Sequence, residues 1–119
     1  MALSLTERER RRLERQLLQR FFHDCVECDS FGYHPTVFRQ MLAEHGPVET
    51  ARMVIMSPDI PVGLTILFER GRLDLTTEAK VLNGRFCRLF DKDLLIRARN
   101  RLQQYHYPDL SCPCLDASP

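Results

Sequence analysis

Apolar residues recur at helical spacing along most of this chain of 119 residues. Near the start, Thr6 and Glu9 have the spacing of a capping box, in which hydroxyl and carboxylate each accept from the other's backbone amide. An apolar stripe on one helix face follows and predicts an N-terminal amphipathic helix over residues 6–28. The stripe comprises Leu13, Leu17, Leu18, Phe21, Phe22 and Cys25. Because it begins only at Leu13, the first two turns of the helix are expected to project past the core or to fray.

Shorter helices are predicted next, each bounded by proline or glycine. Pro35 sits near the first position of one helix, where its missing amide costs nothing, and Gly46 is a typical helix terminator. Pro47 then opens another helix. A further helix from Val62 to Arg70 should stop at Gly71, although residues 66–68 alone would also suit a strand.

The last third repeats these signals. Thr76 and Glu78 lie in the start of a helix that is expected to run to Leu82, and Asp91 caps the final helix. On that final helix the apolar positions point inward, and three basic residues are expected to point towards water: Arg97, Arg99 and Arg101. The segment after Pro108 is rich in proline, serine and aspartate and is expected to be a flexible tail over residues 108–119.

The pattern therefore predicts an all-α fold, a compact single-domain bundle of five to six short helices. The helical domain should span residues 1–107, and its apolar core should draw on the N-terminal helix as well as on the helices that follow. The residues expected at the centre of the core are Leu17, Phe21, Phe38, Met41, Leu42, Ala51, Leu67, Leu82, Leu95 and Leu102.

Composition narrows the function classes. Hydrophobic residues make up 44% of the chain, which suffices for a core. The formal net charge of +1 gives no overall field that favours a polyanion. No apolar run approaches the length of a membrane span or forms a signal peptide, so no membrane association is expected. The five cysteines, an odd number, favour reduced thiols in a cytoplasmic protein.

The middle of the chain carries a recognisable order of motifs. One string runs from Gly32 to Leu42 and continues at Gly46 and Thr50, a second runs from Leu73 to Leu82, and a third comprises Leu89, Phe90, Arg101, Leu102, Tyr105 and Tyr107. Over about residues 31–107 this order resembles an uncharacterised bacterial family of small all-helical domains. The resemblance implies a bacterial helical module, with no established ligand or catalytic residue.

Two cysteine pairs raise the possibility of zinc. Cys25 and Cys28 form a C-x-x-C pair, and Cys112 and Cys114 form a second close pair, which together would supply four thiolates. Against this, Cys25 falls on the apolar face of the first helix, where a cysteine is ordinarily a small buried hydrophobe. One spacer residue between Cys112 and Cys114 is also tight for tetrahedral zinc. We therefore predict no metal ligands and keep a small zinc-stabilised domain as the third hypothesis.

Catalytic chemistry is not predicted. His23, Asp24 and Cys25 are the residue types of a cysteine triad, but consecutive helical residues point about 100° apart and cannot converge on a substrate. No glycine-rich loop with a G-K-[ST] signature is present, so nucleotide binding, a cofactor and a small-molecule substrate are not expected.

The arginines give the second hypothesis, a nucleic-acid-binding module. Residues 1–20 hold six arginines against three glutamates, and residues 85–101 hold five arginines and one lysine against two aspartates. An arginine stripe is typical of phosphate binding, here through Arg8, Arg11, Arg12 and Arg15 of the first helix. However, the spacings Glu7–Arg11, Arg10–Glu14 and Glu9–Arg12 also suit ion pairs along a solvated helix.

The first hypothesis is thus a non-enzymatic helical binding or interaction module with an unknown protein partner. The projecting start of the first helix and outward methionines, Met53 or Met56, would supply docking surface.

Overall fold

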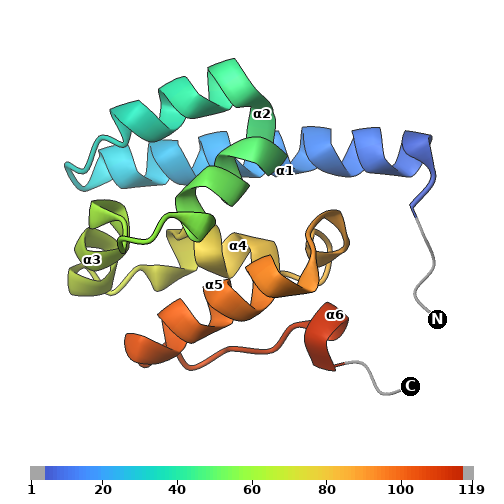
Figure 1. Cartoon of the computed structure of the whole chain (residues 1–119). Coiled ribbons are helices and arrows are strands. Elements are labelled where there is room, and N and C mark those ends of the chain that lie inside the picture. The colour runs from blue at the N-terminus through green and yellow to red at the C-terminus, as the bar shows by residue number, and fades with distance from the viewer. Residues whose placement is uncertain (1–4, 117–119) are drawn as a thin grey trace.

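The first helix begins where its capping box predicts. The structure is a computed structural model that describes residues 5–116, and α1 spans Glu7–Ser30. Thr6 Oγ1 accepts from the Glu9 amide at 3.1 Å, and Glu9 Oε1 accepts from the Thr6 amide at 3.0 Å. The N-terminal turns of α1 extend beyond the kinked part of α2 (Figure 1). The capping box is therefore confirmed. The first turns extend beyond α2, but they do not leave the core altogether, because Leu5 packs against it and Glu9 lies 3.9 Å from Arg88 of η2 (Cys87–Leu89).

The second and third predicted helices are the two halves of one kinked element. α2 spans Thr36–Met56 and breaks at Gly46, whose φ of 79° and ψ of 173° are not helical. Glycine adopts this positive φ readily, and Pro47 cannot donate the next backbone hydrogen bond. The first half runs along α1, and the second half turns down towards α4 and α5 (Figure 1).

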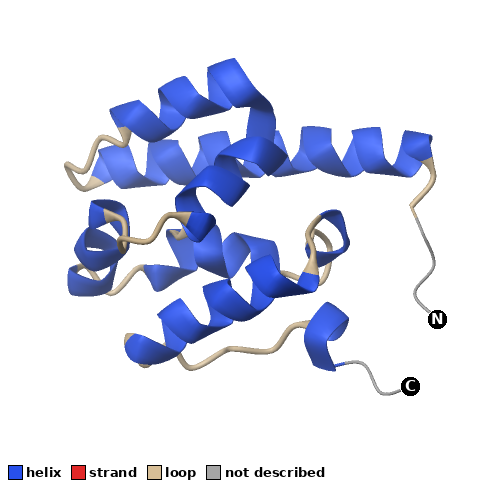
Figure 2. Cartoon of the chain, viewed as in Figure 1, coloured by secondary structure: helices blue, strands red, loops and turns tan. Residues whose placement is uncertain are grey.

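Every regular element among residues 5–116 is helical, as Figure 2 shows. Residues 66–68 are helical too, and no helix in this part of the chain is long and apolar enough to cross a membrane. The prediction of a small all-α bundle of five to six helices is confirmed. Besides α1 and α2, the elements are α3 (Val62–Glu69), η1 (Leu73–Leu75), α4 (Thr77–Leu82), η2 (Cys87–Leu89), α5 (Lys92–Gln104) and α6 (Pro113–Asp116).

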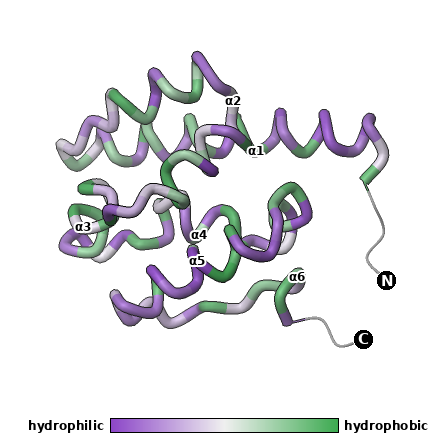
Figure 3. The backbone as a smooth tube through the Cα atoms, viewed as in Figure 1, coloured by the Kyte–Doolittle hydropathy of each residue, from purple (hydrophilic) through white to green (hydrophobic). Residues whose placement is uncertain are grey.

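The short helix α4 lies at the centre of the molecule. It packs against α5 on one side and α2 on the other (Figure 1). Four of its six residues, and its cap Thr76, are buried. The projecting part of α1 is instead mostly hydrophilic in Figure 3. The charged groups of α4 therefore sit in surroundings very different from those of α1.

The predicted core is largely confirmed. Eight of the ten expected residues are buried, whereas Phe38 and Met41 are only partly buried. The Phe38 ring packs edge-on against the buried Phe21 ring, with centroids 5.3 Å apart. Leu67 belongs to a small second cluster with Cys28 and Leu75.

The C-terminal segment is packed rather than loose. Cys112 is fully buried, and Leu110 and Leu115 pack against the main core. Asp116 ends α6 and accepts from Arg99 Nη2 at 2.8 Å. The expectation of a flexible tail is wrong for residues 108–116, because these apolar side chains outweigh the turn-forming residues between them. Residues 117–119 lie outside the described part of the chain.

Candidate functional site

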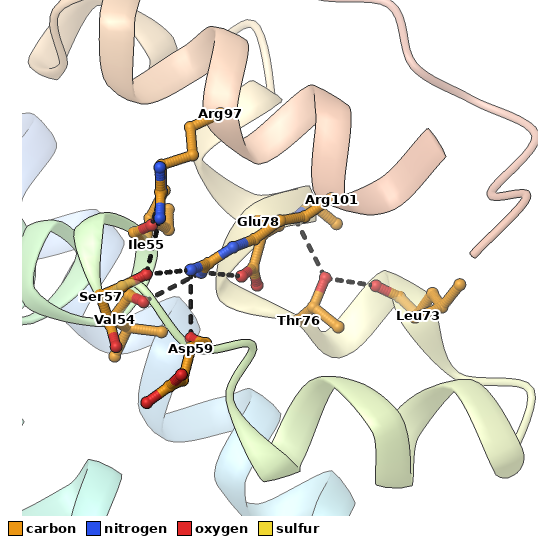
Figure 4. Close-up of polar contacts among 10 residues, drawn as sticks. Val54, Ile55, Ser57, Asp59, Leu73, Thr76, Glu78, Arg97 and Arg101 are labelled. Carbon is orange, nitrogen blue, oxygen red and sulfur yellow. Dashed lines mark hydrogen bonds and ion pairs between the residues drawn. The ribbon is translucent and has the colours of Figure 1, made fainter. Parts of the chain in front are cut away.

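A buried ion pair occupies the centre of the fold. Glu78 of α4 is 2% exposed, and Arg101 of α5 is 5% exposed. Arg101 Nη1 lies 3.1 Å from Glu78 Oε2 (Figure 4). Burial raises the pKa of Glu78, even though Arg101 favours its charged form. Such a pair is costly to break, because either partner alone would be an uncompensated buried charge.

The same arginine also closes the end of α2. Arg101 donates to the carbonyl oxygens of Val54, Ser57 and Asp59 (Figure 4). Arg97 donates to Ile55 O at 2.7 Å and to Ser57 O at 2.8 Å. The last carbonyls of a helix have no partner within the helix and attract cations. These guanidinium groups therefore serve as a C-terminal cap supplied by another helix.

The outward orientation predicted for the α5 arginines is thus wrong for Arg101. It is also wrong in part for Arg97, which is half-buried. Arg99 is half-buried as well and pairs with Asp116. We conclude that the arginine excess in α5 has a structural use, so this helix offers little charge to an outside ligand.

A small cavity lies beside this centre, between α1, α3 and α4. Its volume is about 70 Å³, and Asp24, Cys25, Cys28, Tyr33 and Glu78 are among its lining residues. Sites for small molecules usually measure about 300–1,000 Å³, so this space suits a few water molecules. The Lys80 ammonium lies 3.0 Å from Asp24 Oδ2 without hydrogen-bond geometry, and burial raises the pKa of Asp24 despite that charge.

The cysteines do not gather into one site. Cys25 and Cys28 are buried in α1, and burial raises the pKa of each thiol to about 11, which disfavours thiolate. A disulfide joins Cys114 to Cys87 of η2. Among residues 5–116, no three histidine, cysteine, aspartate or glutamate side chains are placed to hold a metal.

The interpretation of all five cysteines as reduced thiols is therefore wrong for Cys87 and Cys114. The pairing depends on η2 lying against α6, which the spacing of the cysteines in the sequence does not reveal. The expectation of a cytoplasmic location rested on reduced thiols and remains a prediction.

An open groove lies between α1 and the turn that follows α4. Its volume is about 470 Å³. Arg85 Nη1 donates to Gln16 Oε1 at 3.3 Å across it. We call it the basic groove; its lining residues, none of which is acidic, are Gln16, Gln19, Arg20, His23, Arg85 and Phe86.

Two arginine-rich segments meet at the basic groove. Arg12 lies one turn before Gln16 on α1, and Arg88 of η2 lies 3.9 Å from Glu9 of α1. Residues 69 positions apart, Gln16 and Arg85, therefore share one face. Two stretches of arginine are visible in the sequence, but which of their members face each other depends on tertiary structure.

The ion pairs expected along α1 form only in part. Arg11 Nε lies 3.2 Å from Glu7 Oε1, as predicted. Glu9 is instead bonded to Thr6, and within residues 5–116 it has no ion pair with Arg12. Among the described residues, Glu14 also has no ion pair with Arg10. Glu14 lies three residues before the buried Leu17 and therefore on the same side of α1. The predicted neutralisation of α1 by its own carboxylates is therefore weaker than expected.

The exposed arginines and methionines are placed as predicted. Arg8, Arg11, Arg12 and Arg15 are all exposed. Met53 and Met56 are 41% and 46% exposed on the second half of α2. The structure thus leaves both the basic face of α1 and the methionine face of α2 open to a partner.

No protein-family model matches this chain, and no curated protein and no solved structure matches it either. The resemblance over residues 31–107 accordingly stays a prediction.

Proposed function

We propose that this chain is a non-enzymatic binding module that attaches to an anionic partner through the basic groove. The observation that carries the proposal is the meeting of two arginine-rich segments along one open groove without acidic lining. Arg20 and Arg85 are exposed, and neither has an ion-pair partner within residues 5–116; Arg85 has an amide as its partner, and the charge of Arg20 acts on the buried Asp24. Guanidinium groups in this state bind phosphates and carboxylates through paired hydrogen bonds.

The titratable groups elsewhere support a binding role over a catalytic one. Glu78 is held by Arg101, and Asp24 faces Lys80. The thiols of Cys25 and Cys28 have raised pKa values, which lowers the fraction present as thiolate, the nucleophilic form. These groups have structural partners or are deactivated, whereas the groove presents charge to solvent.

The test is a titration with two fluorescent polyanions, a poly-glutamate peptide and an oligonucleotide. Wild type is compared with Arg20→Gln/Arg85→Gln, and the charge-matched control is Arg52→Gln/Arg70→Gln, which alters two exposed arginines outside the groove. We expect wild type and control to bind at least one polyanion, and the groove variant to bind it about tenfold more weakly or worse. Failure of wild type to bind either polyanion, or equal losses in both variants, would refute the proposal.

A further inference from the structure

We infer that the occupant of the basic groove is the phosphodiester backbone of a nucleic acid. This inference rests on the proposed function and adds the class of ligand. Acidic proteins also carry negative charge, so the choice depends on how the positive charges are arranged and on which other donors accompany them.

The exposed arginine side chains are spread along α1 rather than gathered at one position. From Arg8 to Arg20, α1 covers about 18 Å at 1.5 Å per residue. Arg8, Arg12 and Arg15 are exposed within about 60° of one another around the helix, and Arg20 in the groove lies about 120° round from Arg8, with Gln16 and Gln19 at angles between them. A duplex presents about ten phosphates over the same distance. A polymer with regularly repeated negative charge can contact arginines along this whole length. An acidic patch on a folded protein does not require positive charges spread in this way.

The groove donors suit phosphate and sugar oxygens. Arg20 and Arg85 supply planar guanidinium groups, which match phosphate geometry. Gln16 and Gln19 add neutral amides, and side chains of this kind commonly contact phosphate and sugar in nucleic-acid complexes. His23 lines the same groove and lies 3.9 Å from Glu27.

Acidic side chains near the groove are already engaged. Glu9 accepts from the Thr6 amide and lies 3.9 Å from Arg88. Glu7 pairs with Arg11, away from the groove lining. At the other end of the groove, Asp24 is buried and faces Lys80, and Glu27 lies 3.9 Å from His23. A bound backbone would therefore meet acidic side chains that already have a positive or polar neighbour.

Apart from the imidazole of His23, the groove lining offers no exposed aromatic ring for base stacking. Phe86 is its aromatic lining residue and is only 2% exposed. Single-strand binders that use stacking present open aromatic faces. Recognition here would therefore act through the backbone, and the affinity would be independent of sequence and steeply dependent on salt.

The experiment compares single-stranded DNA, duplex DNA and poly-glutamate of equal charge by fluorescence anisotropy across a salt series. We expect DNA to bind at least about tenfold more tightly than poly-glutamate, in the roughly 10⁻⁶–10⁻⁴ M range of non-specific complexes at physiological salt. If Arg8, Arg12, Arg20 and Arg85 each neutralise one phosphate, the log–log salt slope should be about −3.6 for duplex or −2.8 for single strands.

The variants separate the possible outcomes. Arg20→Gln/Arg85→Gln should roughly halve the slope, since two of four contacts are lost, whereas Arg52→Gln/Arg70→Gln should leave it unchanged. Circular dichroism of each variant checks that it is folded. Equal or tighter binding of poly-glutamate overturns this inference but leaves the proposed function standing. Binding of neither polyanion overturns both, and an equal loss of slope in both variants overturns the assignment to the groove.

Discussion

Arginines on α1 and on α5 have opposite relations to the rest of the molecule. On α1, Arg8, Arg12 and Arg15 are exposed, and none has an ion-pair partner within residues 5–116. On α5, Arg101 is almost fully buried and joins Glu78 to the end of α2, with Arg97 beside it (Figure 4). The first group is available to a ligand, whereas the second holds three helices together.

The difference shows that a cluster of arginines in a helix sequence does not by itself indicate whether the side chains bind a ligand or stabilise the fold. Both helices are amphipathic and rich in arginine. What separates them is whether another element ends nearby with unpaired carbonyls and a carboxylate. α2 ends against α5, so Arg97 and Arg101 of α5 donate their hydrogen bonds to carbonyl oxygens of α2. The start of α1 instead extends beyond α2 (Figure 1).

The largest expected effect is on Arg101. Arg101→Ala should lower the free energy of unfolding by about 3–5 kcal/mol, because it leaves Glu78 buried and unpaired. Arg15→Ala on the exposed face of α1 should change it by no more than about 0.5 kcal/mol. Urea denaturation of both variants measures the contrast. A loss below about 1 kcal/mol for Arg101→Ala would show that the central pair contributes little.

Two helix caps of the same type sharpen the comparison. Thr76 is buried, accepts from the Ala79 amide at 3.1 Å and donates to Leu73 O at 2.7 Å. Thr6 makes the equivalent cap of α1 but is exposed. Thr76→Ala should cost about 2 kcal/mol and Thr6→Ala about 0.5–1 kcal/mol, because only the first leaves buried groups unpaired. Thermal unfolding measures the loss of stability in each variant. Equal losses would contradict the burial of the Thr76 cap at the centre of the fold.

The smallest expected effect is an opposite pH dependence of two glutamates. The pKa of Glu9 lies below its ordinary 4.5 because Thr6 bonds its carboxylate, so its stabilisation is present above pH 4.5 and is lost as the pH falls through the lowered pKa. The pKa of Glu78 is raised by burial, so its contribution declines as the pH rises from 4.5 through the raised value.

Stability measured from acid to neutral pH tests these signs. Glu9→Gln should flatten the loss of stability on the acid side, whereas Glu78→Gln should remove a decline towards neutral pH. Glu69→Gln on the surface of α3 serves as a control for the loss of one negative charge. A shift of the same sign in both glutamate variants would contradict the assigned environments.

Local chemistry explains what the sequence could predict. The caps at Thr6, Thr76 and Asp91 and the break at Gly46 each depend on a few neighbouring residues, and all four are present in the structure. The apolar spacing likewise placed Leu17 and Leu102 in the core. Helix starts, helix ends and most inward faces are therefore readable without tertiary information.

Contacts between distant segments could not be read in this way. Arg101 lies at the edge of the apolar face of α5, and its partner Glu78 is 23 residues away. Periodicity cannot tell whether such an edge faces water or another helix. The same holds for the basic groove, since Gln16 and Arg85 become neighbours only when η2 packs on α1.

The disulfide between Cys87 and Cys114 makes a covalent ring from residues 87 to 114. The whole of α5 lies inside this ring. A protease that cuts the exposed backbone near Pro108 or Asp109 would open the ring without releasing a fragment, because the two pieces remain joined through sulfur. The nicked chain would migrate as one species until a reductant is added, and until then α6 would stay tethered to η2 through the disulfide.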